Sequence, residues 1–129
     1  MPAILIIDDD PQMAEVLLQY LDLAGYDDVV TATDAKEAVH WCETRKFDLI
    51  VTDILMPDMD GMEVILKLRV DQKVDTPIIA ISGGGKFNRA AEVLNWAKHL
   101  GISCTLSKPI DRREFITKVT ELLGDKRTS

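Results

Sequence analysis

The stretch AILIIDDDPQ, residues 3–12, joins an aliphatic run to three consecutive aspartates and a proline. The run at 3–7 is nearly continuous in apolar residues, which is typical of a strand buried on both faces of a parallel sheet. Asp10 followed by Pro11 is the pattern of a helix N-cap and a proline at the first helical position. This stretch therefore predicts a buried strand followed by a helix, with Asp8 and Asp9 at the junction.

Four further apolar or β-branched runs follow along the chain, at 29–32, 49–52, 78–81 and 102–106. Segments with helical periodicity separate them. Strict alternation of strands and helices with short connections predicts right-handed crossovers and a single parallel sheet. We therefore expect an α/β fold with a doubly wound, five-stranded parallel sheet.

The predicted helices carry recognisable start, stop and packing signals. Gly25 stops the first helix, a helix over 88–100 stops at Gly101, and the last helix stops at Gly124. Three helix starts have Asp followed by Glu three residues later, like a capping box: Asp34/Glu37, Asp60/Glu63 and Asp111/Glu114. In the first helix one apolar stripe is expected to pack against the sheet: Met13, Val16, Leu17, Tyr20, Leu21 and Ala24.

Composition limits the possible classes of protein. A chain of 129 residues with 47% hydrophobic and 29% charged residues fits one globular domain. Its net charge of −7 makes direct nucleic-acid binding unfavourable. The sequence shows no targeting segment and no membrane-spanning run, so we expect a cytoplasmic protein without membrane insertion. Cys42 and Cys104 are expected to be buried free thiols.

Polar residues fall at the carboxyl ends of the predicted strands. Asp8 and Asp9 end the first strand, Asp53 the third and Ser82 the fourth, and Lys108 follows the fifth. Because the carboxyl ends of parallel strands meet at one edge of a sheet, we expect these side chains to converge there, where open α/β folds bind ligands.

Three aspartates in one small cleft require positive charge nearby. Like charges about 4 Å apart repel by roughly 4 kcal/mol at an effective dielectric constant of about 20. Mg²⁺ binds carboxylate oxygens while keeping several waters, and Lys108 supplies a further positive charge. The sequence thus indicates a Mg²⁺ site formed by Asp8, Asp9 and Asp53, whereas Asp10 is expected to act only as a helix cap.

Four segments, in this order and at this spacing, resemble the receiver domain of two-component response regulators. They are Ile6-Ile7-Asp8-Asp9-Asp10, Thr52-Asp53-Ile54-Leu55-Met56-Pro57-Asp58-Met59-Asp60-Gly61, Ile81-Ser82-Gly83 and Ser107-Lys108-Pro109. The resemblance extends from Ile4 to Leu123. It implies a flavodoxin-like sheet of strand order 2-1-3-4-5, a receiver domain over residues 1–124 and a short tail at 125–129.

The resemblance also implies a role for each residue of the predicted site. Asp53 would be the phosphoacceptor, and Asp9, Asp53 and the Leu55 backbone carbonyl would coordinate Mg²⁺, with Asp8 contributing through water. Lys108 and Ser82 would contact the phosphoryl oxygens. The Lys108–Pro109 peptide would be cis, as is common in this family.

The resemblance further implies a signalling function. The domain would be a single-domain, stand-alone response regulator that catalyses only its own phosphorylation and dephosphorylation. Its partners would be a sensor histidine kinase or a histidine phosphotransfer protein as donor, and a downstream protein target. Two alternatives stay open: a hydrolase of the haloacid dehalogenase type, which would need an acid where Leu55 stands, and an interaction module that is never phosphorylated.

Overall fold

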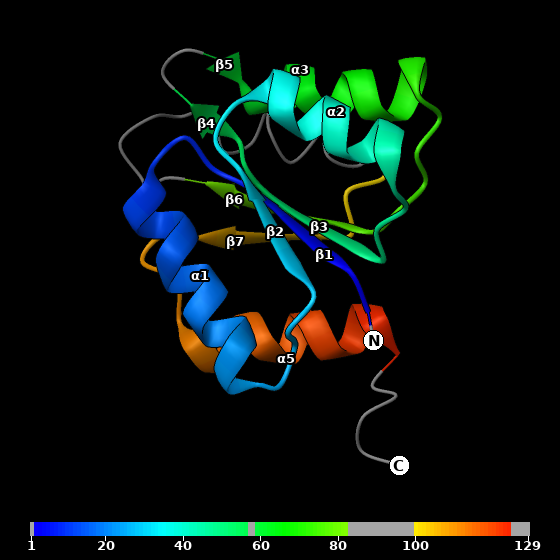
Figure 1. Ribbon diagram of the computed structural model, residues 1–129. Helices are drawn as coiled ribbons and strands as arrows, with labels where there is room; N and C mark the ends of the chain where they lie inside the picture. Colours follow the sequence, from blue (N-terminus) through cyan, green and yellow to red (C-terminus); the bar gives the residue numbers. More distant parts are fainter. Residues whose placement is uncertain (1, 57–58, 83–99, 125–129) are drawn as a thin grey trace.

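A five-stranded parallel sheet forms the centre of the protein, with helices covering both of its faces (Figure 1). The computed structural model describes residues 2–56, 59–82 and 100–124. The strands of the sheet are β1 (Ile4–Ile7), β2 (Val29–Ala32), β3 (Leu49–Asp53), β6 (Ile78–Ser82) and β7 (Cys104–Ser107). The spatial order β2-β1-β3-β6-β7 confirms the predicted order 2-1-3-4-5, since β6 and β7 are its fourth and fifth strands.

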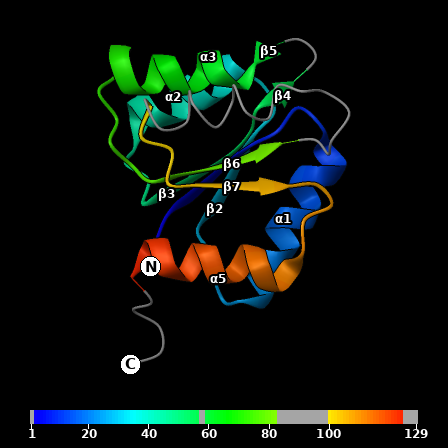
Figure 2. The same cartoon turned by 180° about the vertical axis from the view of Figure 1, so that it is seen from behind.

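The helices lie in two layers, one on each face of the sheet. They are α1 (Pro11–Leu23), α2 (Ala35–Thr44), α3 (Gly61–Leu66), which continues into the π-helix η1 (Lys67–Asp71), and α5 (Arg112–Leu123). Helices α1 and α5 cover one face, and α2 and α3 cover the other, as the view from behind also shows (Figure 2). The predicted helix over 88–100 and the predicted tail lie almost wholly outside the described residues.

Two apolar layers form the core because alternate residues of each strand point to opposite faces. Ile4, Ile6 and Val51 pack toward α1 and α5, together with Phe115 of α5. Leu5, Ile7 and Ile50 belong to the second layer, together with Val64 and Ile65 of α3. The central strands β1 and β3 are buried at every position, while the outer strands β2 and β7 are partly exposed because each has a neighbour on one side only.

Most predicted helix boundaries are confirmed. Asp10, the residue before Pro11, caps α1, because its side chain accepts a hydrogen bond from the Gln12 backbone N–H. Gly25 follows the end of this helix and has a φ of 92°. Asp34 caps α2 and Asp111 caps α5, each through the N–H of the Glu three residues on. At the end of α5, Gly124 adopts the left-handed conformation. The Asp60 side chain lies outside the described part of the structure, so its capping stays a prediction.

Three sequence expectations are wrong in detail. In α1 the buried residues are Ala14, Leu17 and Leu21, whereas Val16, which was expected in the apolar stripe, is 38% exposed. The last strand begins at Cys104, two residues later than expected, where pairing with Ile79 starts. Cys42 and Cys104 are free but only half-buried, because α2 and the outer strand β7 leave one side open.

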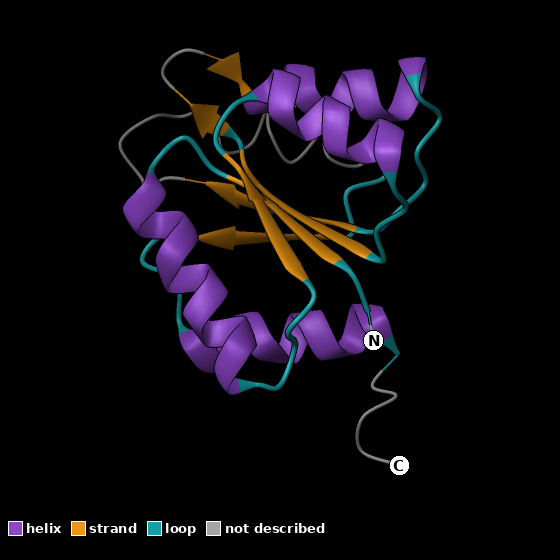
Figure 3. Cartoon of the chain, viewed as in Figure 1, coloured by secondary structure: helices purple, strands orange, loops and turns teal. Residues whose placement is uncertain are grey.

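A short antiparallel pair of strands follows β3 (Figure 3), and the π-helix η1 follows α3; neither was predicted. The pair consists of β4 (Leu55–Met56) and β5 (Met59–Asp60), in which Leu55 lies opposite Asp60. None of the helices in the described part of the chain is long and apolar enough to cross a membrane.

Arg69 of η1 connects three segments at the amino-terminal edge of the sheet. Its guanidinium donates hydrogen bonds to the carbonyl oxygens of Leu100 (2.9 Å), Val74 (2.7 Å) and Gly101 (3.1 Å). Partial burial lowers the pKa of Arg69, and the charge of Asp75 partly offsets this effect. The group stays charged, because an arginine is not deprotonated in proteins.

Candidate functional site

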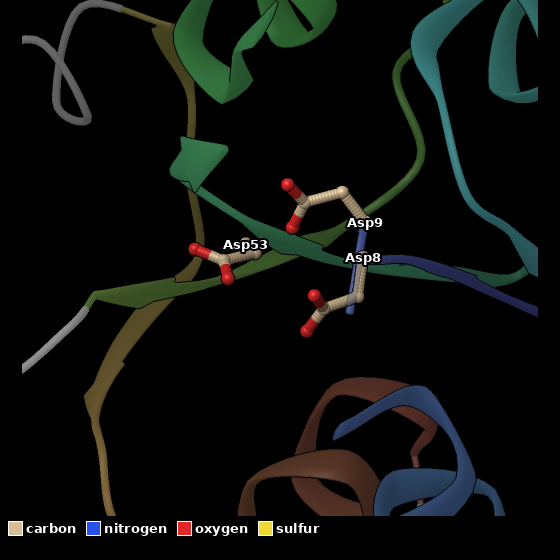
Figure 4. Close-up of side chains that lie close together, drawn as sticks. All are labelled: Asp8, Asp9 and Asp53. Carbon is tan, nitrogen blue, oxygen red and sulfur yellow. The ribbon is translucent and has the colours of Figure 1, made fainter. Parts of the chain in front are cut away.

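Three carboxylates meet at the carboxyl edge of the sheet, on the neighbouring strands β1 and β3 (Figure 4). Asp8 and Asp9 follow β1 directly, and Asp53 is the last residue of β3. The pairing of Ile7 with Thr52 sets the register that brings the aspartates together. One oxygen from each carboxylate lies within 4.8 Å of the other two. The convergence expected from the strand ends is therefore present.

Asp8 and Asp53 are withdrawn from water, with exposed fractions of 1% and 3%. The Oδ1 atom of Asp8 accepts a hydrogen bond from the Asp10 backbone N–H at 2.9 Å. Among the described residues, no hydrogen-bond donor contacts its buried Oδ2 atom. The pKa of Asp8 is raised to about 6, mainly because the side chain is buried and also because Asp53 and Asp9 carry negative charge nearby. The hydrogen bond from the Asp10 N–H and the positive charge of Lys108 partly offset this rise. Asp8 is thus the least satisfied acid of the cluster.

Lys108 supplies positive charge to this edge from the segment after β7. Its Nζ lies 2.9 Å from Oδ2 of Asp53. Burial alone would lower the pKa of Lys108, but the hydrogen bond and the charge of Asp53, with the charge of Asp8, raise it above its ordinary value. The Lys108 backbone N–H donates to the Ser82 carbonyl at 2.9 Å, which joins the segment to β6. The expected cis Lys108–Pro109 peptide is present.

The remaining predicted residues occupy different places around this cluster. Ser82 is the half-buried last residue of β6 and lies opposite Ser107 in the register. Leu55 begins β4, two residues after Asp53, so its backbone lies close to the cluster along the chain. Asp10 is exposed and caps α1. The structure thus separates Asp10 from the three clustered acids, while the individual roles of the site residues stay predictions.

The residues of the cluster fit a divalent cation bound by oxygen ligands. Lys108 provides one positive charge against three carboxylates, and the Oδ2 atom of Asp8 has no donor within the described part of the chain. A hard cation takes carboxylate oxygens as ligands and offsets the repulsion between them. Asp8, Asp9 and Asp53 would hold such an ion.

Thr52 is a buried polar residue next to the cluster that the sequence patterns did not single out. It is fully buried in β3, and its hydroxyl donates to the backbone carbonyl of Asp53 at 3.1 Å. The sequence holds one signal for it, a hydroxyl residue at the end of an otherwise aliphatic run beside Asp53. That signal is ambiguous, since threonine is also common in strands for its β-branched shape.

The fold and the acidic edge define a class of protein: a doubly wound α/β domain with an acid cluster at its carboxyl edge that could hold a cation. The family model of the response regulator receiver domain matches residues 4–120. This chain belongs to that family of signal-transduction domains in two-component systems.

Known relatives agree with this assignment. The alkaline phosphatase synthesis transcriptional regulatory protein PhoP of Bacillus subtilis is 38% identical over 120 residues, covering 93% of this chain and 48% of that protein. The sensor protein EvgS of Escherichia coli is 35% identical over 120 residues, covering 93% of this chain and 10% of that protein. This chain thus spans about half of one relative's length and a tenth of the other's.

Solved structures show the same fold over nearly the whole chain. The chemotaxis response regulator CheY4 of Vibrio cholerae superposes with a TM-score of 0.80 at 28% identity, covering 95% of this chain and 98% of that structure. The hydrolase alternative is set aside, because receiver domains are signalling domains rather than enzymes that turn over a separate substrate.

Proposed function

We propose that Asp53 accepts a phosphoryl group and that this domain thereby acts in a phosphorelay. The observation that carries the proposal is the Asp53 carboxylate, 3% exposed, between two further acids and the Lys108 ammonium. A carboxylate held at a cation-binding edge is a suitable nucleophile for phosphoryl transfer, which depends mainly on positioning and charge stabilisation.

In the proposed reaction, an Asp53 oxygen forms a bond to phosphorus while the bond from phosphorus to a histidine nitrogen of the donor breaks. The electron pair of the broken bond stays on that nitrogen. A bound Mg²⁺ ion would neutralise charge on the transferred group. Asp9, Asp53 and the Leu55 carbonyl would hold the ion, and Asp8 would contribute through water.

Lys108 and Ser82 would act on the phosphoryl group after transfer. The Lys108 ammonium, now 2.9 Å from Asp53, would pair with a phosphoryl oxygen, and the Ser82 hydroxyl would donate to another. The contacts of both residues would then differ between the two states, which is what a conformational switch requires. The partners we propose are a histidine kinase or histidine phosphotransfer protein as donor and a protein target as reader, with no direct contact to nucleic acid.

Mass spectrometry after incubation with acetyl phosphate and Mg²⁺ tests the proposal. The wild-type protein should gain one phosphate, and Asp53→Asn should gain none. Asp10→Asn is the matched control, because it removes an exposed acid of the same segment, and asparagine still caps a helix. Labelling that persists in Asp53→Asn would contradict the assignment. A wild type that takes no phosphate from acetyl phosphate or from a phosphorylated donor would instead favour the interaction module.

A further inference from the structure

The hydroxyl of Thr52 occupies an unusual place in the apolar core. Thr52 is fully buried and lies two residues after Ile50 in β3, so by strand alternation both side chains point to the layer beneath α2 and α3. Asp53 points to the opposite face of the strand. A valine would fill nearly the same volume without placing a hydroxyl among aliphatic side chains, so packing alone does not explain Thr52.

Thr52 holds one end of the peptide group that follows the phosphoacceptor. Its Oγ1 donates to the Asp53 carbonyl oxygen at 3.1 Å. The same peptide group carries the N–H of Ile54, which donates to the Ile81 carbonyl of β6 at 2.9 Å. The peptide plane between Asp53 and Ile54 is therefore fixed at both its oxygen and its nitrogen.

The orientation of this plane matters for both neighbours. Asp53 precedes it and carries the carboxylate, while Leu55, one residue beyond Ile54, carries the backbone carbonyl proposed to face the cation. Rotation of the plane would change the direction in which the chain leaves β3 and would move the two oxygen ligands relative to each other. Mg²⁺ demands nearly ideal geometry, so small displacements of its ligands weaken its binding.

We propose that Thr52 is a positioning residue, whose hydroxyl aims the Asp53 carboxylate and the Leu55 carbonyl at a common cation. The inference rests on the proposed function, because it assigns to these two groups the roles given there. Thr52 itself contacts neither the cation nor the phosphoryl donor, and acts through the Asp53–Ile54 peptide.

Thr52→Val and Thr52→Ser separate positioning from packing. Valine keeps the shape and loses the donor, whereas serine keeps the donor. Thr52→Val should weaken Mg²⁺ binding about tenfold, as substitution of groups that orient metal ligands typically does, and Thr52→Ser should stay near wild type. In the metal-free protein, the NMR signal of the Ile54 amide should move in Thr52→Val but much less in Thr52→Ser.

Thr76 offers a matched control at the opposite edge of the sheet. It is also a buried threonine, and its hydroxyl donates to the Phe47 carbonyl at 3.0 Å. Thr76→Val should leave Mg²⁺ affinity and the Ile54 signal unchanged. An equal loss of Mg²⁺ affinity in both valine variants would indicate a general loss of stability and would contradict positioning by Thr52.

A folded Thr52→Val protein with wild-type Mg²⁺ affinity and wild-type labelling by acetyl phosphate would overturn the inference. If Thr52→Val fails to fold, Thr52→Ala is measured by the same criteria. Failure of the proposed function has a different signature, since neither the wild type nor any variant at position 52 would then take up phosphate at Asp53.

Discussion

Two ion pairs at opposite edges of the sheet have almost the same length and very different surroundings. At the carboxyl edge, Lys108 Nζ lies 2.9 Å from Asp53 Oδ2, and the two side chains are 31% and 3% exposed. At the amino edge, Arg45 Nη2 lies 2.8 Å from Asp28 Oδ2, and the exposed fractions are 33% and 39%. The cations are equally open to water, so the difference lies in the acids.

This difference shows that burial, rather than distance, separates the pair at the acid cluster from the surface pair. Water screens the charges of Arg45 and Asp28, and the arginine also stacks over the Phe47 ring at 4.9 Å. At the other edge, Asp53 is buried beside a second buried acid, Asp8, and one ammonium faces both. Among the described residues, Asp28 and Arg45 therefore balance each other at the amino edge, whereas at the carboxyl edge three carboxylates face the single ammonium of Lys108.

Substitution of Arg69, at the amino edge of the sheet, should cause the largest loss of stability. Arg69→Met removes the donor of three carbonyl groups, and hydrogen bonds to charged groups contribute about 1.5–3 kcal/mol each without adding fully. We expect a loss of about 2–4 kcal/mol in the free energy of unfolding, measured in urea, and an intermediate loss for Arg69→Lys. Arg113→Met, an exposed arginine on α5, is the control. A loss no larger than that of the control would show that the amino edge does not depend on Arg69.

Removal of the Asp8 charge, at the carboxyl edge, should cause the largest gain of stability. Its pKa is raised from 3.8 to about 6 in the folded protein, so the folded state binds the proton more tightly than the unfolded state. Stability is therefore lost as pH rises from about 4 to about 6. Since a shift of about two pKa units corresponds to at most about 3 kcal/mol, Asp8→Asn should stabilise the metal-free protein by up to that amount at pH 7.

Urea unfolding with a chelator, at pH values from 4 to 8, measures this effect. The advantage of Asp8→Asn over the wild type should shrink toward pH 4, where Asp8 becomes protonated. A constant advantage at all pH values would contradict the assignment of the effect to the Asp8 charge.

Adding Mg²⁺ should reduce the contrast between the two edges. At a free concentration ten times the Kd, a ligand that binds only the folded state stabilises it by about 1.4 kcal/mol. The wild type should show this increase, and a chelator should remove it. Asp9→Asn should lose most of the increase at the same concentration, while Asp10→Asn should keep it. An equal loss in both variants would mean that the acids of this segment act only through their total charge.

The smallest effect is expected at the exposed pair. Asp28→Asn should cost less than about 1 kcal/mol in the free energy of unfolding, and this cost should fall as salt screens the interaction. Urea unfolding at low and high ionic strength measures it. A larger, salt-independent cost would remove the distinction drawn between the two ion pairs.

Local patterns made most of the fold predictable. The continuous aliphatic runs located the central strands, and Asp10, Asp34 and Asp111 marked helix starts because a cap needs only neighbouring residues. The edge of the sheet that gathers Asp8, Asp9 and Asp53 could also be predicted, since it follows from strand direction alone.

Features that depend on three-dimensional neighbours could not be predicted in this way. Which side of α1 faces the sheet is decided by packing in the folded protein, so Ala14 is buried and Val16 is exposed, although the periodicity placed Val16 rather than Ala14 in the apolar stripe. The contacts of Arg69 join residues 31 and 32 positions apart, at Leu100 and Gly101, and nothing local announces them. The hydroxyl of Thr52 faces its own neighbour's carbonyl, which depends on a side-chain rotamer rather than on a residue pattern.

The wide spacing of the site along the chain has a consequence for biosynthesis. Asp8 leaves the ribosome well before Lys108, which is made only after β7. Chains emerge from the amino terminus first, and sheets with non-local pairings form late. If β1 and β3 pair before synthesis reaches β7, the three carboxylates meet before Lys108 is present. We expect the carboxyl edge to close last, when the final strand brings its lysine, and a dissolved cation to serve as counter-charge until then.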